Sequence, residues 1–260
     1  MKLGFIGMGN MAQALANGFL AAGALAAKDI RAYAPNQQKL AANAKKIGFL
    51  PVGTAAEAVA DADFVFMACK PAQIAQVITD LGDALAGKAI VSVALGWDLA
   101  RYEAVLPQGA RVQFVMPNTP AAVSEGVFLF EAATTLLADE FDALRALFGK
   151  IGTVIMLTSA QMGIGGAIAG CGPAFVDMMI EAFADAGVRY GLTREQALVM
   201  TSQMVLGAAK LQLVTGKHPG ELKDAVCSPG GSTIRGVAAL EEAGFRANCI
   251  SAITAIMEKK

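Results

Sequence analysis

The spacing of apolar residues divides the chain into two halves of different character. Up to about residue 157, short apolar runs alternate with segments whose apolar residues recur about every 3.6 positions. Strands that alternate with helices are typical of βαβ units and a mostly parallel sheet. The expected strands are Lys2–Ile6, Ile30–Tyr33, Phe64–Ala68, Ala89–Val93, Val112–Met116, Gly126–Phe130 and Gly152–Leu157, and the helices between them include Met11–Ala22, Gln37–Ile47 and Phe141–Phe148.

After Ser159 the pattern predicts helices only. They are Pro173–Tyr190, Thr193–Val214, Thr233–Ala243 and Phe245–Lys260, with Thr193 and Gln196 placed as a capping box. The segment Thr193–Val214 is apolar around most of its circumference, and such a helix must be buried. A small helical domain does not bury it alone. We therefore expect an α/β domain over residues 1–158 and an all-α domain over residues 159–260 that forms a homodimer.

The composition also indicates that many apolar side chains must be buried. Hydrophobic residues make up 55% and charged residues 17% of the chain, and the mean hydropathy is +0.50. The uncharged stretch Ile151–Val176 is long enough to span a bilayer, but polar residues, repeated glycines and Pro173 interrupt it. It reads better as a strand, a short helix and a glycine-rich turn before the next helix. Together with an N-terminus too short and glycine-rich for a signal peptide, this predicts a cytoplasmic protein without a membrane segment.

Charge, cysteine and histidine exclude several classes of function. Lys and Arg number 21 against 22 Asp and Glu, a balance that argues against a nucleic-acid binder. The four cysteines lie far apart without a C-x-x-C pair, so neither a disulfide framework nor a metal site is expected. The single histidine, His218, sits in a turn by composition, where it is more often solvated or capping than catalytic.

The first chemical motif directly follows the first strand. Gly7, Gly9 and Ala12 form G-x-G-x-x-A between Ile6 and the first helix, with Asn10 and Met11 inside the motif. The first glycine permits a tight turn, the second lets a pyrophosphate approach the backbone, and the alanine lets helix and strand pack closely. An incidental turn is the alternative, but the position between strand and helix favours a Rossmann-type dinucleotide-binding domain.

The ends of later strands refine this cofactor site. No Asp or Glu occurs between Asp29 and Glu57, where an NAD site needs an acid, whereas Asn36 and Lys39 are present. This favours a 2′-phosphate, hence NADPH with NADH as the other candidate, although Asn36 can equally cap the next helix. Ligands bind at the carboxyl ends of parallel strands. We therefore add Ala68, Lys70, Pro71 and Asn118 to the cofactor site, while the Asn118 amide could instead bond to its own turn.

The stretch Val226–Gly236 is the most unusual in the helical half. Ser228, Gly230 and Gly231 surround a proline in a turn, and Ser232 and Thr233 begin a helix. Successive N–H groups at such a turn can hold an anion. An ordinary helix cap by Ser232 or Thr233 explains the same residues.

Several motifs together resemble one family, that of pyrroline-5-carboxylate reductase, over essentially the whole chain. They are, in order, Phe5–Ala12, Met116–Pro120, Gly170–Phe175, Glu221–Asp224, Ser228–Ile234, Leu240-Glu241 and Gly244–Arg246. One departure is Cys171, which stands where the family usually has Ser in a G-S-G-P turn.

The resemblance implies the last step of L-proline biosynthesis, the NAD(P)H-dependent reduction of L-1-pyrroline-5-carboxylate. It places the nicotinamide between the loops of the first domain and the helical domain. It assigns the substrate to Ser228, Gly230, Gly231, Ser232 and Thr233, with the carboxylate on N–H groups around Gly231–Thr233. The Thr233 hydroxyl then faces the ring nitrogen as the catalytic group. It also implies an interlaced homodimer that can assemble further.

Two other interpretations remain open. The β-hydroxyacid dehydrogenases also join a Rossmann-type domain to a helical one, but they typically use a catalytic Lys followed four residues later by Asn. Here Lys210 is followed by Val214 at that spacing, so the pattern fails. A non-catalytic NADP(H)-binding sensor is the second alternative, against which the intact Ser228–Thr233 and Met116–Pro120 motifs argue.

Overall fold

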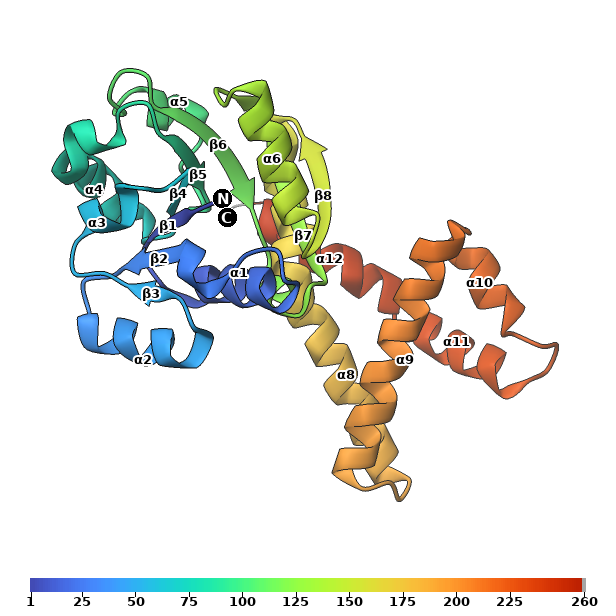
Figure 1. The fold of residues 1–260 in the computed structure, drawn as a ribbon. Helices are drawn as coiled ribbons and strands as arrows, with labels where there is room; N and C mark the ends of the chain where they lie inside the picture. The colour runs from blue at the N-terminus through green and yellow to red at the C-terminus, as the bar shows by residue number, and fades with distance from the viewer. Residues whose placement is uncertain (259–260) are drawn as a thin grey trace. The chain divides into compact units, whose positions relative to one another are not determined.

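The computed structural model describes residues 1–258 and divides the chain into two compact units (Figure 1). Unit 1 is Met1–Gly170 and unit 2 is Cys171–Lys260. The first contains all eight strands of the described chain, and the second is helical. The predicted fold class, an α/β domain followed by an all-α domain, is confirmed. The exact boundary at 158/159 stays a prediction.

Unit 1 is built on one sheet in the order β3-β2-β1-β4-β5-β6-β7-β8. Its strands are β1 (Leu3–Ile6), β2 (Ile30–Tyr33), β3 (Leu50–Pro51), β4 (Phe64–Met67), β5 (Ala89–Ser92), β6 (Arg111–Met116), β7 (Gly126–Thr134) and β8 (Gly152–Leu157). All neighbours are parallel except β6 and β7. The strand order reverses between β1 and β4, and such a switch point opens a crevice at the carboxyl ends of the strands.

Helices cover both faces of this sheet (Figure 1). They are α1 (Asn10–Ala21), α2 (Gln37–Ile47), α3 (Ala55–Val59), α4 (Ile74–Leu81), α5 (Leu99–Glu103), α6 (Ala138–Phe148) and α7 (Ser159–Gly166). Successive side chains of a strand point to opposite faces. Phe64 and Phe66 of β4 accordingly join the core under α1, α2 and α6, and Val65 and Met67 join the core under α3, α4 and α5. The unbroken apolar run of β4 follows from burial on both sides.

Several elements of unit 1 differ from the expectation, among them the short helices α3 and α5, which were not predicted. β3 was not predicted, because a two-residue edge strand containing Pro51 shows no apolar pattern. The eight-residue helix α4 was also not predicted. The segment expected as a glycine-rich turn is a π-helix, Ala167–Cys171, which continues α7 directly into the next helix. Such short π segments inside helices occur frequently at functional sites.

Unit 2 consists of helices, as predicted. They are α8 (Gly172–Arg189), α9 (Arg194–Thr215), α10 (Pro219–Ala225), α11 (Ser232–Glu242) and α12 (Phe245–Met257). Helix α10 was not among those expected, and the last two residues of the expected helix Phe245–Lys260 lie outside the described residues. The expected capping box is confirmed, because Gln196 N–H donates to Thr193 Oγ1 at 3.2 Å and Thr193 N–H donates to Gln196 Oε1 at 3.1 Å. His218 caps α10 by accepting the Gly220 N–H at Nδ1 over 3.1 Å, and capping was one of the two roles expected for it.

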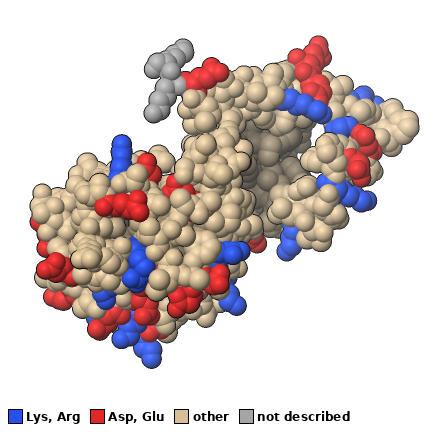
Figure 2. Space-filling view, turned by 90° about the horizontal axis from the view of Figure 1, so that it is seen from above, with Lys and Arg blue, Asp and Glu red and all other residues tan. Residues whose placement is uncertain are grey.

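Most apolar side chains of unit 2 are exposed within the single chain. Among its described residues only Ala184, Ala197 and Thr201 are buried. The helical stretches Ser159–Arg189 and Arg194–Thr215 are long and apolar enough to cross a membrane by length and composition, and little of either is buried inside the chain. Much of the helical part seen in Figure 2 is free of charged side chains. This surface needs a cover from outside the chain.

Candidate functional site

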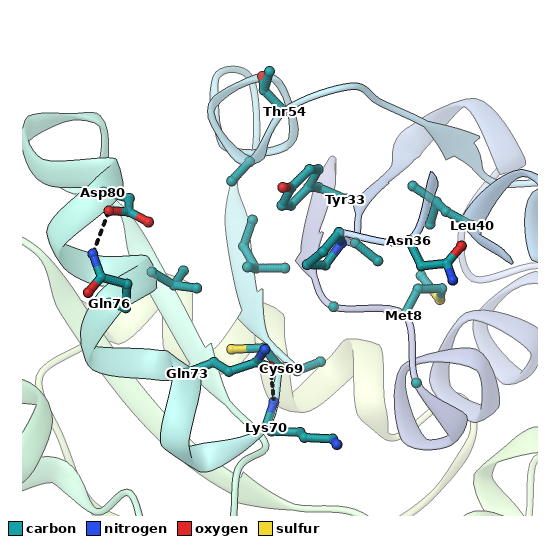
Figure 3. A pocket seen from close by; sticks show the side chains of 18 of the residues that line it. Met8, Tyr33, Asn36, Leu40, Thr54, Cys69, Lys70, Gln73, Gln76 and Asp80 are labelled. Atoms are coloured by element: carbon teal, nitrogen blue, oxygen red, sulfur yellow. Dashed lines mark hydrogen bonds between the residues drawn. The ribbon is translucent and has the colours of Figure 1, made fainter. Parts of the chain in front are cut away.

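A cavity of about 820 Å³ opens at the carboxyl ends of β1, β2 and β4. Its walls come from the loops after these strands and from α2, the start of α3 and α4 (Figure 3). The lining residues are Ile6, Gly7, Met8, Gly9, Tyr33, Ala34, Pro35, Asn36, Lys39, Leu40, Asn43, Thr54, Ala55, Ala56, Ala68, Cys69, Lys70, Ala72, Gln73, Gln76, Val77, Asp80 and Leu81. It lies at the switch point between β1 and β4, where a dinucleotide binds in this fold.

Gly7 brings two of these loops into contact. Its φ angle is +99°, and a Cβ at this position would lie 2.6 Å from the Ala68 carbonyl oxygen and 2.7 Å from the Cys69 nitrogen. The Gly7 N–H donates to the Tyr33 carbonyl at 2.7 Å, which ties the turn to β2 as well. Only glycine satisfies both the backbone angle and the close approach.

The N-terminus of α1 is prepared for an anion. Gly9 is the N-cap, makes no side-chain cap bond, and has open space where a Cβ would be. The first turn, which contains Asn10 and Met11, carries no acidic residue. Free N–H groups and the helix dipole therefore favour phosphate here. Ala12 lies buried behind this turn, in the core against the sheet.

The loop before α1 is itself held in place. The Met8 carbonyl accepts a hydrogen bond from Gln13 Nε2 at 3.1 Å and one from Asn43 Nδ2 at 3.5 Å. These bonds fix the loop to both α1 and α2. With Gly7 and Gly9, they give a preorganised cradle that fits the pyrophosphate of a dinucleotide.

Asn36 caps α2 and, in the described part of the chain, keeps its amide nitrogen free. Its Oδ1 accepts the Lys39 N–H at 2.9 Å, so it caps α2. The amide nitrogen makes no hydrogen bond within residues 1–258, which leaves a donor for a ligand at the cavity wall (Figure 3). Lys39 and Lys70 also line the cavity, where the one acid, Asp80, accepts from Gln76 Nε2 at 2.7 Å. The charges favour a phosphorylated ligand.

The loop after β4 contributes Ala68, Cys69 and Lys70 to the cavity. Lys70 N–H donates to Gln73 Oε1 at 3.3 Å, which caps the short helix that starts at Pro71 (Figure 3). Pro71 stands between two lining residues but does not itself line the cavity. Burial raises the pKa of the Cys69 thiol and keeps it neutral. Within residues 1–258, no group of three or more His, Cys, Asp or Glu side chains could hold a metal ion.

Asn118 lies apart from this cavity. It is 5% exposed, its Oδ1 accepts the Val127 N–H at 2.8 Å, and its Nδ2 donates to the Ala169 carbonyl at 3.0 Å. The side chain thus joins the loop after β6 to the start of β7 and to the π-helix Ala167–Cys171. These bonds join residues farther apart in the sequence than the bond within its own turn that was considered above. A role in cofactor binding stays a prediction.

In unit 2, the turn before α11 leaves donors free. The N-cap of α11 is Gly231, and the helix has no side-chain cap and no acid in its first turn. The alternative of an ordinary cap by Ser232 or Thr233 is therefore wrong. Two hydrogen bonds close the turn. The Gly231 N–H donates to the Ser228 carbonyl at 3.0 Å, and Arg235 Nη1 donates to the Gly230 carbonyl at 3.1 Å. Exposed hydroxyls and N–H groups together suit a carboxylate.

Sequence reasoning missed the wall formed by Tyr33, Thr54 and α4. From α4 and the residue before it, Gln73, Gln76, Val77 and Asp80 line the cavity at spacings of three and four residues, so they share one helix face. Recognising α4 as a helix would have shown this face. The lining side chains of α4 belong to none of the motifs recognised in the sequence, and only the packing of α4 beside β4 brings them to the cavity.

Comparisons with known proteins identify the family of the chain. Residues 159–260 match the family model described as pyrroline-5-carboxylate reductase dimerisation, and residues 2–96 match the model described as NADP oxidoreductase coenzyme F420-dependent. The chain is 44% identical to pyrroline-5-carboxylate reductase of Treponema pallidum, with 99% of both chains covered. It is 38% identical to the Escherichia coli enzyme of that name, covering 99% of this chain and 96% of that one.

Solved structures extend the likeness to three dimensions. Plasmodium falciparum pyrroline carboxylate reductase with NADP bound has a TM-score of 0.87 at 29% identity, covering 98% of this chain and 95% of that one. The Coxiella burnetii enzyme has a TM-score of 0.86 at 32% identity, with the same coverage. A 3-hydroxyisobutyrate dehydrogenase of Mycobacterium tuberculosis shares only the fold, at a TM-score of 0.53 and 18% identity. The chain belongs to the pyrroline-5-carboxylate reductase family.

Proposed function

We propose that this chain reduces the C=N bond of L-1-pyrroline-5-carboxylate to give L-proline, with NADPH as the preferred reductant and NADH as the second candidate. The observation that carries the proposal is the uncapped, hydroxyl-rich start of α11 in a chain that also has a glycine-lined dinucleotide cavity. Relatives at 44% and 38% identity bear the name of this activity. The dinucleotide, when bound, supplies the hydride.

The residues of the chain supply binding and orientation. A protonated imine is already an electrophile, so its reduction needs a fixed geometry and an anchor for the carboxylate more than a strong base. We assign the anchor to the turn of Ser228, Gly230, Gly231 and Ser232. The Gly231 N–H closes this turn, and the exposed hydroxyls of Ser228 and Ser232 and the N–H groups at the start of α11 serve as donors. The Thr233 hydroxyl is free of any cap bond and acts as hydrogen-bond partner or proton relay to the ring nitrogen.

The test is loss of NADPH absorbance on adding L-1-pyrroline-5-carboxylate, with a 3-hydroxy acid plus NADP as the comparison reaction. Thr233→Ala should lower kcat by roughly 10- to 100-fold, the scale of one proton-transfer group, and leave the NADPH Kd unchanged. Thr233→Ser keeps the hydroxyl and should retain most of kcat. No NADPH oxidation by the wild-type protein with the imine would overturn the function, and an unchanged kcat in Thr233→Ala would remove the role of that residue.

The preference for NADPH is tested at Asn36. Asn36→Asp keeps a cap for α2, since aspartate is an equally good N-cap. Its carboxylate repels a 2′-phosphate and accepts from a 2′-hydroxyl, so the ratio of kcat/KM for NADPH over NADH should fall by about tenfold or more. Asn248→Asp makes the same charge change in unit 2 and should leave the ratio unchanged. An unaltered ratio in Asn36→Asp would show that other residues set the preference.

The assembled form is a homodimer through residues 159–260, the segment that matches the dimerisation model. The exposed apolar helices of unit 2 support it. We further propose that dimers can associate into larger assemblies and that the enzyme works in the cytoplasm without a membrane span or a nucleic-acid partner. On the face that Figure 2 shows, positive and negative side chains of the α/β part are interspersed, without the basic patch of a nucleic-acid binder. Sedimentation of the purified protein without detergent tests the soluble dimer.

A further inference from the structure

Trp97, the single tryptophan of the chain, connects two loops beside the dinucleotide cavity. It lies after β5, and its indole Nε1–H donates to the Pro71 carbonyl in the loop after β4 at 2.9 Å. Pro71 is flanked by Lys70 and Ala72, which both line the cavity. The same carbonyl accepts the Ile74 N–H at the start of α4. The indole therefore holds the point at which the wall of the cavity turns into α4.

Local structure aims the indole at this carbonyl. The Trp97 N–H closes a turn on the Ala94 carbonyl at 3.2 Å, and Gly96 in that turn has a φ angle of +82°. Arg101 donates from Nη1 to the Gly96 carbonyl, and Asp98 caps α5. The Trp97 ring packs on the fully buried Tyr102 with ring centroids 5.0 Å apart. The half-buried ring is thus supported on one side, and its N–H is free to reach outward.

The segment that Trp97 holds is fixed at its other end by the glycine turn. Ala68 N–H donates to the Ile6 carbonyl at 2.9 Å, and the Ala68–Cys69 backbone lies against Gly7. The backbone from Ala68 to Pro71 is therefore pinned at both ends, once by the phosphate-binding turn and once by the indole. Lys70 lies between the two points, and its side chain is exposed. Loss of the hydrogen bond from Trp97 to the Pro71 carbonyl would therefore let Lys70 and the first turn of α4 move together.

We propose that Trp97 is a positioning residue for the dinucleotide. It does not line the cavity, and it acts through Pro71 by holding Lys70 and the start of α4 where the ligand meets them. Preorganisation of this kind raises affinity because the loop loses less freedom on binding. The inference rests on the proposed function only in that the cavity binds NADPH.

Trp97→Phe tests the hydrogen bond, because phenylalanine keeps a ring against Tyr102 and lacks the donor. We expect the NADPH Kd, read from the fluorescence of the nucleotide itself, to rise about five-fold, which corresponds to about 1 kcal/mol for one lost hydrogen bond. At saturating NADPH, kcat should change by less than about two-fold, because the reacting groups are untouched. Tyr102→Phe keeps both rings and the indole donor and should leave the Kd unchanged. An unchanged Kd in Trp97→Phe, or a loss of kcat at constant Kd, would overturn the proposal.

A second measurement uses the wild-type protein, so it holds even where the variant folds poorly. The emission of an indole overlaps the near-ultraviolet absorption of reduced nicotinamide. Titration with NADPH should quench the Trp97 emission and saturate at the Kd found from nucleotide fluorescence, and NADP⁺, which lacks that absorption, should change it less. An emission unaffected by both nucleotides would contradict the placement of Trp97 beside the cavity that binds the nucleotide. If the wild type binds NADPH without reducing the imine, the proposed activity fails while the Trp97 inference is still tested by binding.

Discussion

Unit 1 and unit 2 differ in how they bury their apolar side chains. In unit 1 the rings of Phe5, Phe66 and Phe148 are fully buried between the sheet and its helices. In unit 2 the buried residues of the described chain are only Ala184, Ala197 and Thr201, although its helices are no less apolar. A sheet covered on both faces completes its core within one chain, whereas long helices packed only in pairs do not. We therefore expect the first unit to complete its core within one chain and the second to depend on another copy.

The largest expected effect comes from a charge on α9. Met200, Met204 and Leu211 lie on one face of this helix and are 60%, 49% and 53% exposed. Met204→Glu places an unpaired carboxylate in the expected dimer interface, at a cost on the order of 3–5 kcal/mol. The dimer should dissociate, unit 2 should lose its fold, and turnover should fall by more than about 100-fold. Sedimentation and the NADPH assay measure this directly.

Val105→Glu is the matched control for this variant. Val105 is 43% exposed in unit 1, so the same charge stays in water there. We expect an intact dimer with normal turnover. A dimeric, active Met204→Glu protein would mean that this face of α9 is covered by something other than a second chain, and the contrast between the units would need another explanation.

The next effect concerns the aromatic core of unit 1. The Phe148 ring packs against Phe19, Phe66, Phe128 and Phe130, with ring centroids 4.7–6.1 Å apart. Phe148→Ala should lower the free energy of unfolding by about 3–5 kcal/mol, as expected for an aromatic side chain removed from a tight core. Urea unfolding at fixed protomer concentration measures it, because the stability of a dimer depends on concentration. A loss below about 1 kcal/mol would show that this core is loosely packed.

The two regions also differ in how far sequence predicts them. The strands of unit 1 were recognisable because runs such as Phe64–Met67 are apolar on both faces, and the Gly7 turn because its position between strand and helix is specific. The two residues of β3 and the α4 wall of the cavity were not, since their place depends on packing rather than on a local pattern. At α11, Ser232 and Thr233 are good capping residues, so sequence could not show that Gly231 takes the cap and leaves both hydroxyls free.

The smallest expected effect separates a partly buried ion pair from an exposed one. In unit 1, Arg111 binds Glu140 with two hydrogen bonds, Nε to Oε2 at 2.8 Å and Nη2 to Oε1 at 2.5 Å. The two side chains are 23% and 19% exposed. Glu140 Oε2 also accepts the Leu137 N–H at 2.9 Å, at the start of α6. In unit 2, Arg194 pairs with Asp185 at 2.6 Å, but these side chains are 51% and 60% exposed.

The Arg111 guanidinium, followed by the Leu137 N–H, holds the pKa of Glu140 below its ordinary value. The folded state therefore binds the proton less well than the unfolded state. The stabilisation is fully present above the unfolded carboxyl pKa of about 4.3 and is lost as the pH falls through the lower folded value. Glu140→Gln should cost about 1–2 kcal/mol at neutral pH and nothing in sufficient acid.

Asp185→Asn provides the comparison, since it removes the charge from a pair that water already screens. It should cost at most about 0.5 kcal/mol at any pH. Thermal unfolding of both variants and the wild type, from neutral pH to pH values below the pKa of a free carboxyl, resolves the difference. Each kcal/mol shifts the Tm of a chain this size by about 2–4 °C. An Asp185→Asn loss as large as that of Glu140→Gln would place Asp185 in a buried setting. The second chain of the dimer would then supply for unit 2 the enclosure that the sheet and helices supply for unit 1.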